Sequence, residues 1–249
     1  LILTELSAAP MDEALLQKAL RLGEITLRGQ FVAGSNATFL ADCSFESFHL
    51  PVVYKPIRGQ APLWDFDRRS LPAREVAAWR LAGLLGWDFV PVTILRCRSL
   101  PLGAGSLQGF IDHDPRRHYF NFSLDEKVAL RPIALFDVIA NNADRKGGHL
   151  LLDGAGKCWA IDHALCFHQE PKLRSVIWDF AGEALRAEER HALERLEESF
   201  AGGTAQKRLN PCLSAAEIIM IRQRNLALLQ ENVFPLPAPE RRNFPWPLV

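Results

Sequence analysis

The amino-acid sequence predicts an α+β fold with two lobes, the first rich in β-strands and the second mainly helical. Three observations lead to this prediction. Short segments with the β-branched and aromatic residues typical of strands gather in the first half of the chain. Apolar residues recur at helical spacing over longer segments of the second half. The length, 249 residues, is sufficient for two closely packed lobes with a substantial core.

The first lobe is expected to open with a helix over residues 11–22, where acidic residues precede apolar positions at helical spacing. A second helix is expected over residues 72–85, because Pro72 lies near its first turn and Gly86 follows its end. The predicted strands and extended segments of this lobe are 24–28, 37–41, 51–56, 89–98 and 106–111.

The second lobe is expected to begin with a largely apolar helix over residues 125–143. The predicted elements after it are a strand pair, 149–152 and 158–161, and two helices, 175–200 and 214–229. A change in composition near residues 106–114 leads us to assign residues 1–107 to an N-terminal lobe and residues 108–249 to a C-terminal lobe. The junction of two lobes is a favoured place for a nucleotide-binding cleft.

Composition narrows the range of partners. Lys plus Arg equals Asp plus Glu, so no overall attraction to nucleic acid follows, and we expect no nucleic-acid partner. Apolar runs stay below the ~18 residues needed to span a bilayer, so no transmembrane segment is expected. The five cysteines are widely spaced and form no CxxC pair, which favours reduced thiols in a cytoplasmic protein.

The segment GQFVAGSNATF, residues 29–39, can form a glycine-containing turn between two strands. In such a turn, backbone N–H groups at Gly29 and Gly34 can approach phosphate oxygens, and Ser35 and Asn36 can add side-chain donors. An ordinary hairpin loop is the alternative interpretation.

Lys55 lies within the short apolar strand VVYKP, and Glu75 follows 20 residues later in the predicted helix. A lysine that projects into a cleft can act as a point charge on phosphate, and a helix glutamate can hold it by ion pairing. The alternatives are a solvated lysine at a sheet edge and a surface glutamate.

Residues 136–167 carry the strongest pattern. A polar loop, ADRKGGH, follows an apolar helix, and a predicted hairpin then delivers a second acid. Asp144 and Asp162 are 18 residues apart, with His149 between them. Two acids placed in this way can divide the work of phosphoryl transfer, one orienting a nucleophile and the other holding a metal ion. The alternative is a pair of aspartates that cap turns.

These segments resemble known kinases. ADRKGGH resembles the catalytic loop Asp-Arg-x-x-x-Asn of phosphatidylinositol 3-/4-kinases and of HipA-like kinases. IDHALCF resembles the metal-binding Asp-Phe-Gly-type segment, in the Asp-Asn-Gly form of type II phosphatidylinositol 4-kinases. The resemblance covers roughly residues 24–180 and implies a bilobal protein-kinase-like fold that binds ATP with Mg²⁺ or Mn²⁺.

The resemblance also implies roles for individual residues. Asp144 corresponds to the aspartate that orients the acceptor hydroxyl, and Asp162 to the one that binds the metal ion. Lys55 and Glu75 correspond to the phosphate-binding lysine and its partner. Backbone near residues 108–111 would contact adenine. The nucleotide-binding set is therefore Gly29, Gly34, Ser35, Asn36, Lys55, Glu75, Gln108 and Phe110.

The chain departs from the pattern at His149, where the resembling kinases have a metal-binding Asn. A neutral imidazole can bind a softer ion such as Mn²⁺, and Asn142 is an alternative oxygen ligand. We expect γ-phosphoryl transfer to a hydroxyl, on a protein Ser/Thr or on the chain itself. The alternatives left open are a lipid or small-molecule kinase, an adenylyltransferase, and a nucleotide-binding pseudokinase that acts as a regulator.

Overall fold

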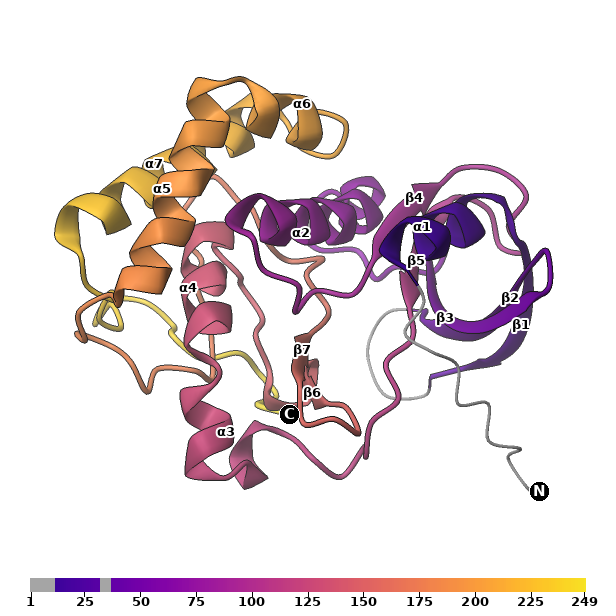
Figure 1. Cartoon of the computed structure of the whole chain (residues 1–249), viewed down its shortest axis with the longest axis horizontal. Helices are drawn as coiled ribbons and strands as arrows, with labels where there is room; N and C mark the ends of the chain where they lie inside the picture. The colour runs from indigo at the N-terminus through magenta and orange to yellow at the C-terminus, as the bar shows by residue number, and fades with distance from the viewer. Residues whose placement is uncertain (1–11, 32–36) are drawn as a thin grey trace.

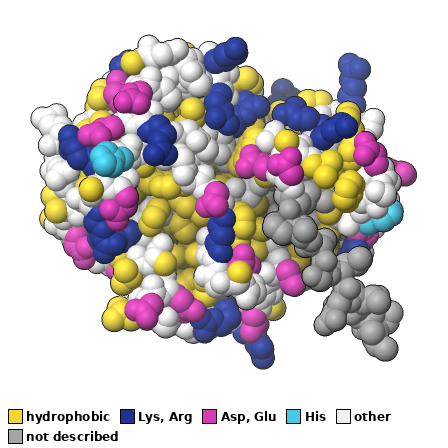
Figure 2. All heavy atoms as spheres, in the orientation of Figure 1, with side chains coloured by type: hydrophobic (Ala, Val, Ile, Leu, Met, Phe, Trp, Pro, Cys, Tyr) yellow, Lys and Arg dark blue, Asp and Glu magenta, His cyan; other side chains and the backbone are white. Residues whose placement is uncertain are grey.

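The computed structural model describes residues 12–31 and 37–249. Figure 1 places a curved β-sheet on one side of the molecule and most of the helices on the other, with the helix α2 between them. The predicted α+β architecture is therefore confirmed. Figure 2 shows acidic and basic side chains interspersed over the face in view, as expected from their equal numbers. Within the described ranges, no helix is both long and apolar enough to cross a membrane.

The sheet has five antiparallel strands in the order β1-β2-β3-β5-β4. Their bounds are β1 Glu24–Gln30, β2 Phe39–Phe45, β3 Phe48–Pro56, β4 Thr93–Arg96 and β5 Gly105–Gly109. Helix α1, Glu13–Leu22, packs on the sheet through Ala19 and Leu20. Because side chains alternate along a strand, Val52 and Tyr54 of β3 enter this core, and Lys55 lies on the opposite face of the strand.

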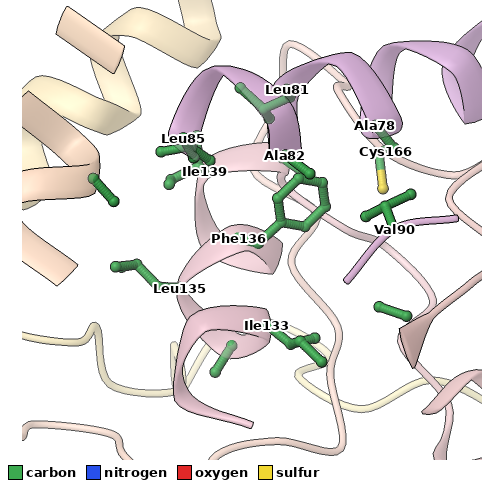
Figure 3. Packing of buried hydrophobic residues seen from close by; sticks show 14 of the residues in the cluster. Ala78, Leu81, Ala82, Leu85, Val90, Ile133, Leu135, Phe136, Ile139 and Cys166 are labelled. Carbon is green, nitrogen blue, oxygen red and sulfur yellow. The ribbon is translucent and has the colours of Figure 1, made fainter. Parts of the chain in front are cut away.

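Helix α2, Leu71–Leu85, joins the two halves of the molecule. Figure 3 shows its residues Leu81, Ala82 and Leu85 beside Phe136 and Ile139 of helix α4. The helix also contacts β4 and β5, so it is buried on several sides. It ends at Gly86, whose φ of 76° is the left-handed conformation that glycine adopts readily.

The second half is mainly helical. Its helices are α3 Leu124–Val128, α4 Arg131–Ala140, α5 Ala187–Ala201, α6 Thr204–Leu209 and α7 Ala215–Glu231. A two-stranded hairpin, β6 Leu150–Leu152 with β7 Cys158–Ala160, lies between α4 and α5 in the chain. Three short 3-10 segments complete the described structure, η1 Arg68–Ser70, η2 Tyr119–Asn121 and η3 Gly147–His149.

Several predicted elements differ from those found. The helix predicted over residues 125–143 is two helices, because Pro132 has no backbone N–H with which to continue the hydrogen bonding of α3 and lies instead in the first turn of α4. The helix predicted over 175–200 starts only at Ala187, since Gly182 has a φ of 78° that interrupts it. The strand predicted over 89–98 is limited to β4, and α6 was not predicted.

Candidate active site

The ammonium group of Lys55 joins three elements of the fold. Lys55 on β3 forms an ion pair with Glu75 on α2, and its Nζ lies 3.0 Å from Oδ1 of Asp162, which follows β7. The second carboxylate oxygen of Glu75 accepts a hydrogen bond from the backbone N–H of His163 at 3.0 Å. The ion pair between Lys55 and Glu75 predicted from the sequence is therefore confirmed, and Asp162 is a further partner.

Burial and charge act against each other in this cluster. Burial acts to lower the pKa of Lys55, but the carboxylates of Asp162 and Glu75 outweigh it and raise the pKa above its ordinary value. Burial acts to raise the pKa of Asp162, but the Lys55 ammonium outweighs it and holds the pKa below its usual range. Burial dominates at Glu75 and raises its pKa. Lys55 and Asp162 are therefore charged at neutral pH.

Asp144 lies in the loop after α4, residues 142–149, which we call the Asp144 loop. Its backbone N–H donates to Oδ1 of Asn142 at 3.0 Å, and Nδ2 of Asn142 donates to Oδ1 of Asp137 at 2.9 Å. Asn142 is fully buried and bonded on both sides of its amide, and binding of its Oδ1 to a metal ion stays a prediction. Lys146 Nζ lies 3.4 Å from Oδ2 of Asp144.

The carboxyl group of Asp144 is only 24% exposed. Burial raises the pKa of Asp144 to about 6, although the Lys146 ammonium acts in the opposite direction. A carboxylate with a pKa near the working pH accepts a proton readily, which suits the role of orienting and deprotonating a hydroxyl.

Arg145 anchors the Asp144 loop to helix α4. Its fully buried guanidinium donates to both carboxylate oxygens of Asp137, at 2.8 and 2.9 Å. It also donates to the carbonyl oxygen of Ile161 at 2.8 Å and lies 2.8 Å from Nε2 of His163. These two residues flank Asp162, so one arginine holds the segment that carries Asp162 as well as the loop that carries Asp144.

The interpretation of the sequence missed this network. Arg145 stands in a polar loop, where a solvated arginine is the usual outcome. The signal was Asp137, a single acid within the apolar helix segment IALFDVIA. An acid on a buried helix face requires a buried cationic or hydrogen-bonding partner.

His149 contacts the carboxylate oxygen of Asp162 that Lys55 does not contact. Its Nε2 lies 3.3 Å from Oδ2 of Asp162, and its Nδ1 accepts a hydrogen bond from the backbone N–H of Lys146 at 3.4 Å. Burial lowers the pKa of His149 to about 4, so the ring is neutral at pH 7. Because Nδ1 is an acceptor, the neutral ring carries its hydrogen on Nε2 and donates it to Asp162.

The predicted adenine-contacting backbone, residues 108–111, begins in the last two residues of β5. Gln108 is buried, and its Nε2 donates to Oγ1 of Thr93 at 2.8 Å, so its side chain holds two strands together. The backbone N–H of Phe110 donates to the carbonyl oxygen of Pro51 at 3.3 Å. A contact between this backbone and adenine stays a prediction.

The predicted phosphate-binding turn is described only in part. Gly29 ends a register shift in the β1–β2 pairing, and a Cβ atom built on it would meet no atom within 4 Å. Open space above Gly29 is compatible with the approach of a ligand. Gly34, Ser35 and Asn36 lie outside the described residues.

A divalent ion fits this site when a nucleotide supplies part of its coordination. In the described ranges, no group of three or more His, Cys, Asp or Glu side chains is placed to hold a metal ion. Asp162 nevertheless offers a charged, 41% exposed carboxylate, the hard oxygen ligand that Mg²⁺ and Mn²⁺ bind. Mg²⁺ is commonly held by one or two carboxylates together with substrate phosphates.

Comparison with known proteins identifies a relative of this chain. No family model matches it. Protein Rv2133c of Mycobacterium tuberculosis is 36% identical over 260 residues, which cover 90% of this chain and 92% of the relative. The chain therefore belongs to the same family as Protein Rv2133c.

Solved structures identify the fold. The crystal structure of the golgi casein kinase matches with a TM-score of 0.56 at 14% identity, covering 88% of this chain and 75% of that one. The crystal structure of the Helicobacter pylori proinflammatory kinase CtkA has a TM-score of 0.49 at 12% identity, covering 86% of this chain and 94% of that one. On the first of these matches, the chain has a protein-kinase-like fold, as the sequence predicts.

Proposed function

We propose that the protein is an ATP-dependent phosphotransferase that moves the γ-phosphoryl group of ATP to a hydroxyl, on a protein Ser/Thr or on itself. The observation that carries this proposal is the Lys55 ammonium, held between Glu75 and Asp162 inside a protein-kinase-like fold. The resemblance of the Asp144 loop to that of phosphatidylinositol 3-/4-kinases and HipA-like kinases supports it.

Each residue has a distinct part in the proposed reaction. Lys55 binds the phosphates of ATP, and Glu75 keeps its ammonium in place. Asp162 holds Mg²⁺ or Mn²⁺, which neutralises charge on the phosphates when bound. Asp144 orients the acceptor hydroxyl and receives its proton. His149 steadies the second oxygen of Asp162 through its Nε2–H.

The remaining parts of the site are proposed from the sequence pattern and the placement of the elements. Backbone at residues 108–111 contacts adenine, and the turn that begins at Gly29 covers the phosphates. The two lobes divide at residues 107 and 108, so this backbone lies at their junction. A cytoplasmic location, favoured by the unpaired cysteines, belongs to the same proposal.

One observation favours a second candidate, a nucleotide-binding pseudokinase that acts as a regulator. In the resembling kinases an Asn binds metal at the position of His149. Here Nε2 of His149 carries a hydrogen that faces Asp162, so it offers no lone pair in that tautomer. The site then has one metal ligand fewer. Binding of His149 to Mn²⁺ would require the other tautomer and stays a prediction.

Intact-protein mass spectrometry after incubation with ATP and either Mg²⁺ or Mn²⁺ tests the proposal. A gain of phosphoryl groups supports self-phosphorylation, whereas a gain of AMP indicates adenylyl transfer. Phosphorylation of added hydroxyl-bearing proteins, with unmodified enzyme, indicates transfer to another protein. Nucleotide binding without any transfer supports the regulator. The Asp144→Asn variant is the matched control, because it retains the residues that bind nucleotide.

A further inference from the structure

Residues 238–249, which we call the tail segment, return from the helical half of the molecule to the Asp144 loop. Figure 1 shows the yellow end of the chain beside the hairpin of β6 and β7, close to where that loop ends. The carbonyl oxygen of Leu248 accepts a hydrogen bond from the backbone N–H of Gly147 at 2.7 Å. The tail segment therefore supplies, from outside the loop, an acceptor for one of its glycines.

The tail segment also bonds residues 175–178, a segment that lies beside the Asp144 loop. The carbonyl oxygen of Asn243 accepts from the backbone N–H of Ser175 and from the indole Nε1 of Trp178, both at 3.0 Å. Ser175 forms a parallel bridge with Arg145, the residue after Asp144. The tail segment thus contacts the Asp144 loop directly at Gly147. It also supports the loop indirectly, because it bonds Ser175, which pairs with Arg145.

Close packing at Gly147 shows that this contact is specific. A Cβ atom on Gly147 would lie 3.0 Å from the ring of Phe120 and 3.4 Å from the carbonyl oxygen of Leu248. A side chain here would therefore push either the ring or the tail segment away. Glycine loses more backbone freedom on folding than any other residue type, so contacts from outside the loop help to order Gly147 and Gly148.

A turn within the tail segment aims Asn243 at these partners. Nδ2 of Asn243 donates to the carbonyl oxygen of Ala238 at 2.8 Å, and the N–H of Ala238 donates back to Oδ1 at 3.1 Å. This reciprocal pair closes the turn, so the Asn243 side chain fixes the place where its own carbonyl meets Ser175 and Trp178.

We propose that the tail segment positions the Asp144 loop for phosphoryl transfer, an inference that rests on the proposed function. The bond from Leu248 fixes Gly147, and Gly147 follows Lys146, whose ammonium lies 3.4 Å from Asp144. Asn243 and Leu248 are positioning residues: they act on Asp144 through the loop backbone. Loosening the tail segment lowers the rate of transfer and leaves nucleotide affinity intact, because Lys55 and Glu75 lie on other elements and the buried side chain of Arg145 continues to hold the segment that carries Asp162.

The test uses a double variant of the full chain, Asn243→Ala with Trp178→Phe, which opens the turn and removes the indole donor. Arg241→Ala is the matched control, because this exposed neighbour contributes only its backbone N–H to the turn. Hydrogen exchange of the peptide containing residues 144–149 is measured together with ATP affinity and the rate of phosphoryl incorporation. If the double variant does not fold, Trp178→Phe alone keeps the aromatic ring and removes one donor.

Exchange in the 144–149 peptide is expected to rise about tenfold in the double variant, the order expected for losing about one hydrogen bond. Phosphoryl incorporation is expected to fall about tenfold, since small displacements near reacting groups are costly, while ATP affinity changes less than about twofold. Faster exchange confined to residues 238–249, or faster phosphoryl incorporation, would overturn the proposal. If the parent protein transfers no phosphoryl group, the proposed function fails, and the exchange result still decides whether the tail segment orders the loop.

Discussion

Asp144 and Asp162 face one site from two regions of the molecule, and their surroundings act on them in opposite directions. Asp162 follows β7 and contacts the Lys55 ammonium at 3.0 Å, which holds its pKa below the usual range against the effect of burial. Asp144 lies in the loop after α4, where burial raises its pKa to about 6 and outweighs the lowering of the pKa by the Lys146 ammonium. One carboxyl group is kept charged, and the other is kept ready to take a proton.

In the proposed reaction, this difference separates metal binding from proton transfer. A carboxylate that remains charged over the physiological range can hold a divalent ion at all working pH values. A carboxylate that titrates near pH 6 can accept the proton of an acceptor hydroxyl and release it again. Pairs of titratable groups whose environments push their pKa values apart commonly mark the division of roles in an active site.

The largest effect is expected from Asp144→Asn, which removes the proton acceptor and keeps the shape of the side chain. Phosphoryl incorporation should fall by about 10²- to 10⁴-fold, the usual contribution of general acid–base catalysis. Metal-dependent ATP affinity should change little, because Asp162 and Lys55 are intact. Mass spectrometry of the incorporated phosphoryl groups, with calorimetry of ATP binding, makes this comparison. Equal loss of binding and transfer would show that the two carboxylates do not have separate roles.

Arg145→Leu tests whether both carboxylates depend on one buried support. The change leaves Asp137 buried without a cation, and breaking a buried pair in this way costs about 3–5 kcal/mol of unfolding free energy. Chemical denaturation should also show that Arg145→Leu combined with Asp137→Leu is less destabilised than the single variant, since no charge is then stranded. A single variant as stable as the parent would contradict the role assigned to Arg145.

Replacing Asp144 or Asp162 with asparagine, one at a time, should change the stability of the protein in opposite directions. The raised pKa of Asp144 means that ionising it opposes folding at neutral pH, so Asp144→Asn should stabilise the protein by about 1–3 kcal/mol. The lowered pKa of Asp162 means that its charge favours folding, so Asp162→Asn should destabilise it. Thermal unfolding at pH 8, where both carboxyl groups are ionised, measures both changes. Shifts of the same sign would remove the contrast between the two regions.

The pH dependence of turnover should follow Asp144. The group is active as a carboxylate, so the rate should fall on acidification through about pH 6, by about tenfold for each further pH unit. The sign for stability is the reverse: the folded state binds this proton more tightly, so its contribution to stability is lost as pH rises from about 4 to 6. Parallel rate and unfolding measurements between about pH 4 and 8 examine both. A rate that is flat across pH 6 would exclude Asp144 as the group that titrates.

Local patterns in the sequence were enough for the parts of the fold and site that depend on neighbours in the chain. Pro72 and Gly86 bound α2 closely, and the apolar segments around DGAG mark the β6–β7 hairpin. The alternation along β3 places Lys55 on the face away from the sheet core. The ion pair between Lys55 and Glu75 could therefore be predicted from their spacing and from the resemblance to known kinases alone.

Contacts between distant segments were not accessible in this way. The break between α3 and α4 and the late start of α5 depend on backbone conformation at single residues, where helical apolar spacing continues regardless. The Arg145 network joins α4, the loop and the segment after β7, and the tail segment reaches Gly147 across about 100 residues of chain. Their donors and acceptors are partly backbone groups, which leave no mark on the amino-acid pattern.

The assignment of Asp162 as the metal-binding carboxylate can be tested by calorimetry of ATP binding to the parent protein and to Asp162→Ala, with and without Mg²⁺. We expect the parent to bind ATP more tightly with the metal ion than without it. In Asp162→Ala, the ATP affinity measured with Mg²⁺ should fall by more than about 100-fold, beyond the 10- to 100-fold typical of residues outside the coordination shell. Asp144→Asn, measured beside it, should retain the gain. Equal metal-dependent affinity in the parent and in Asp162→Ala would contradict the assignment of Asp162 and, with it, the proposed phosphotransferase site.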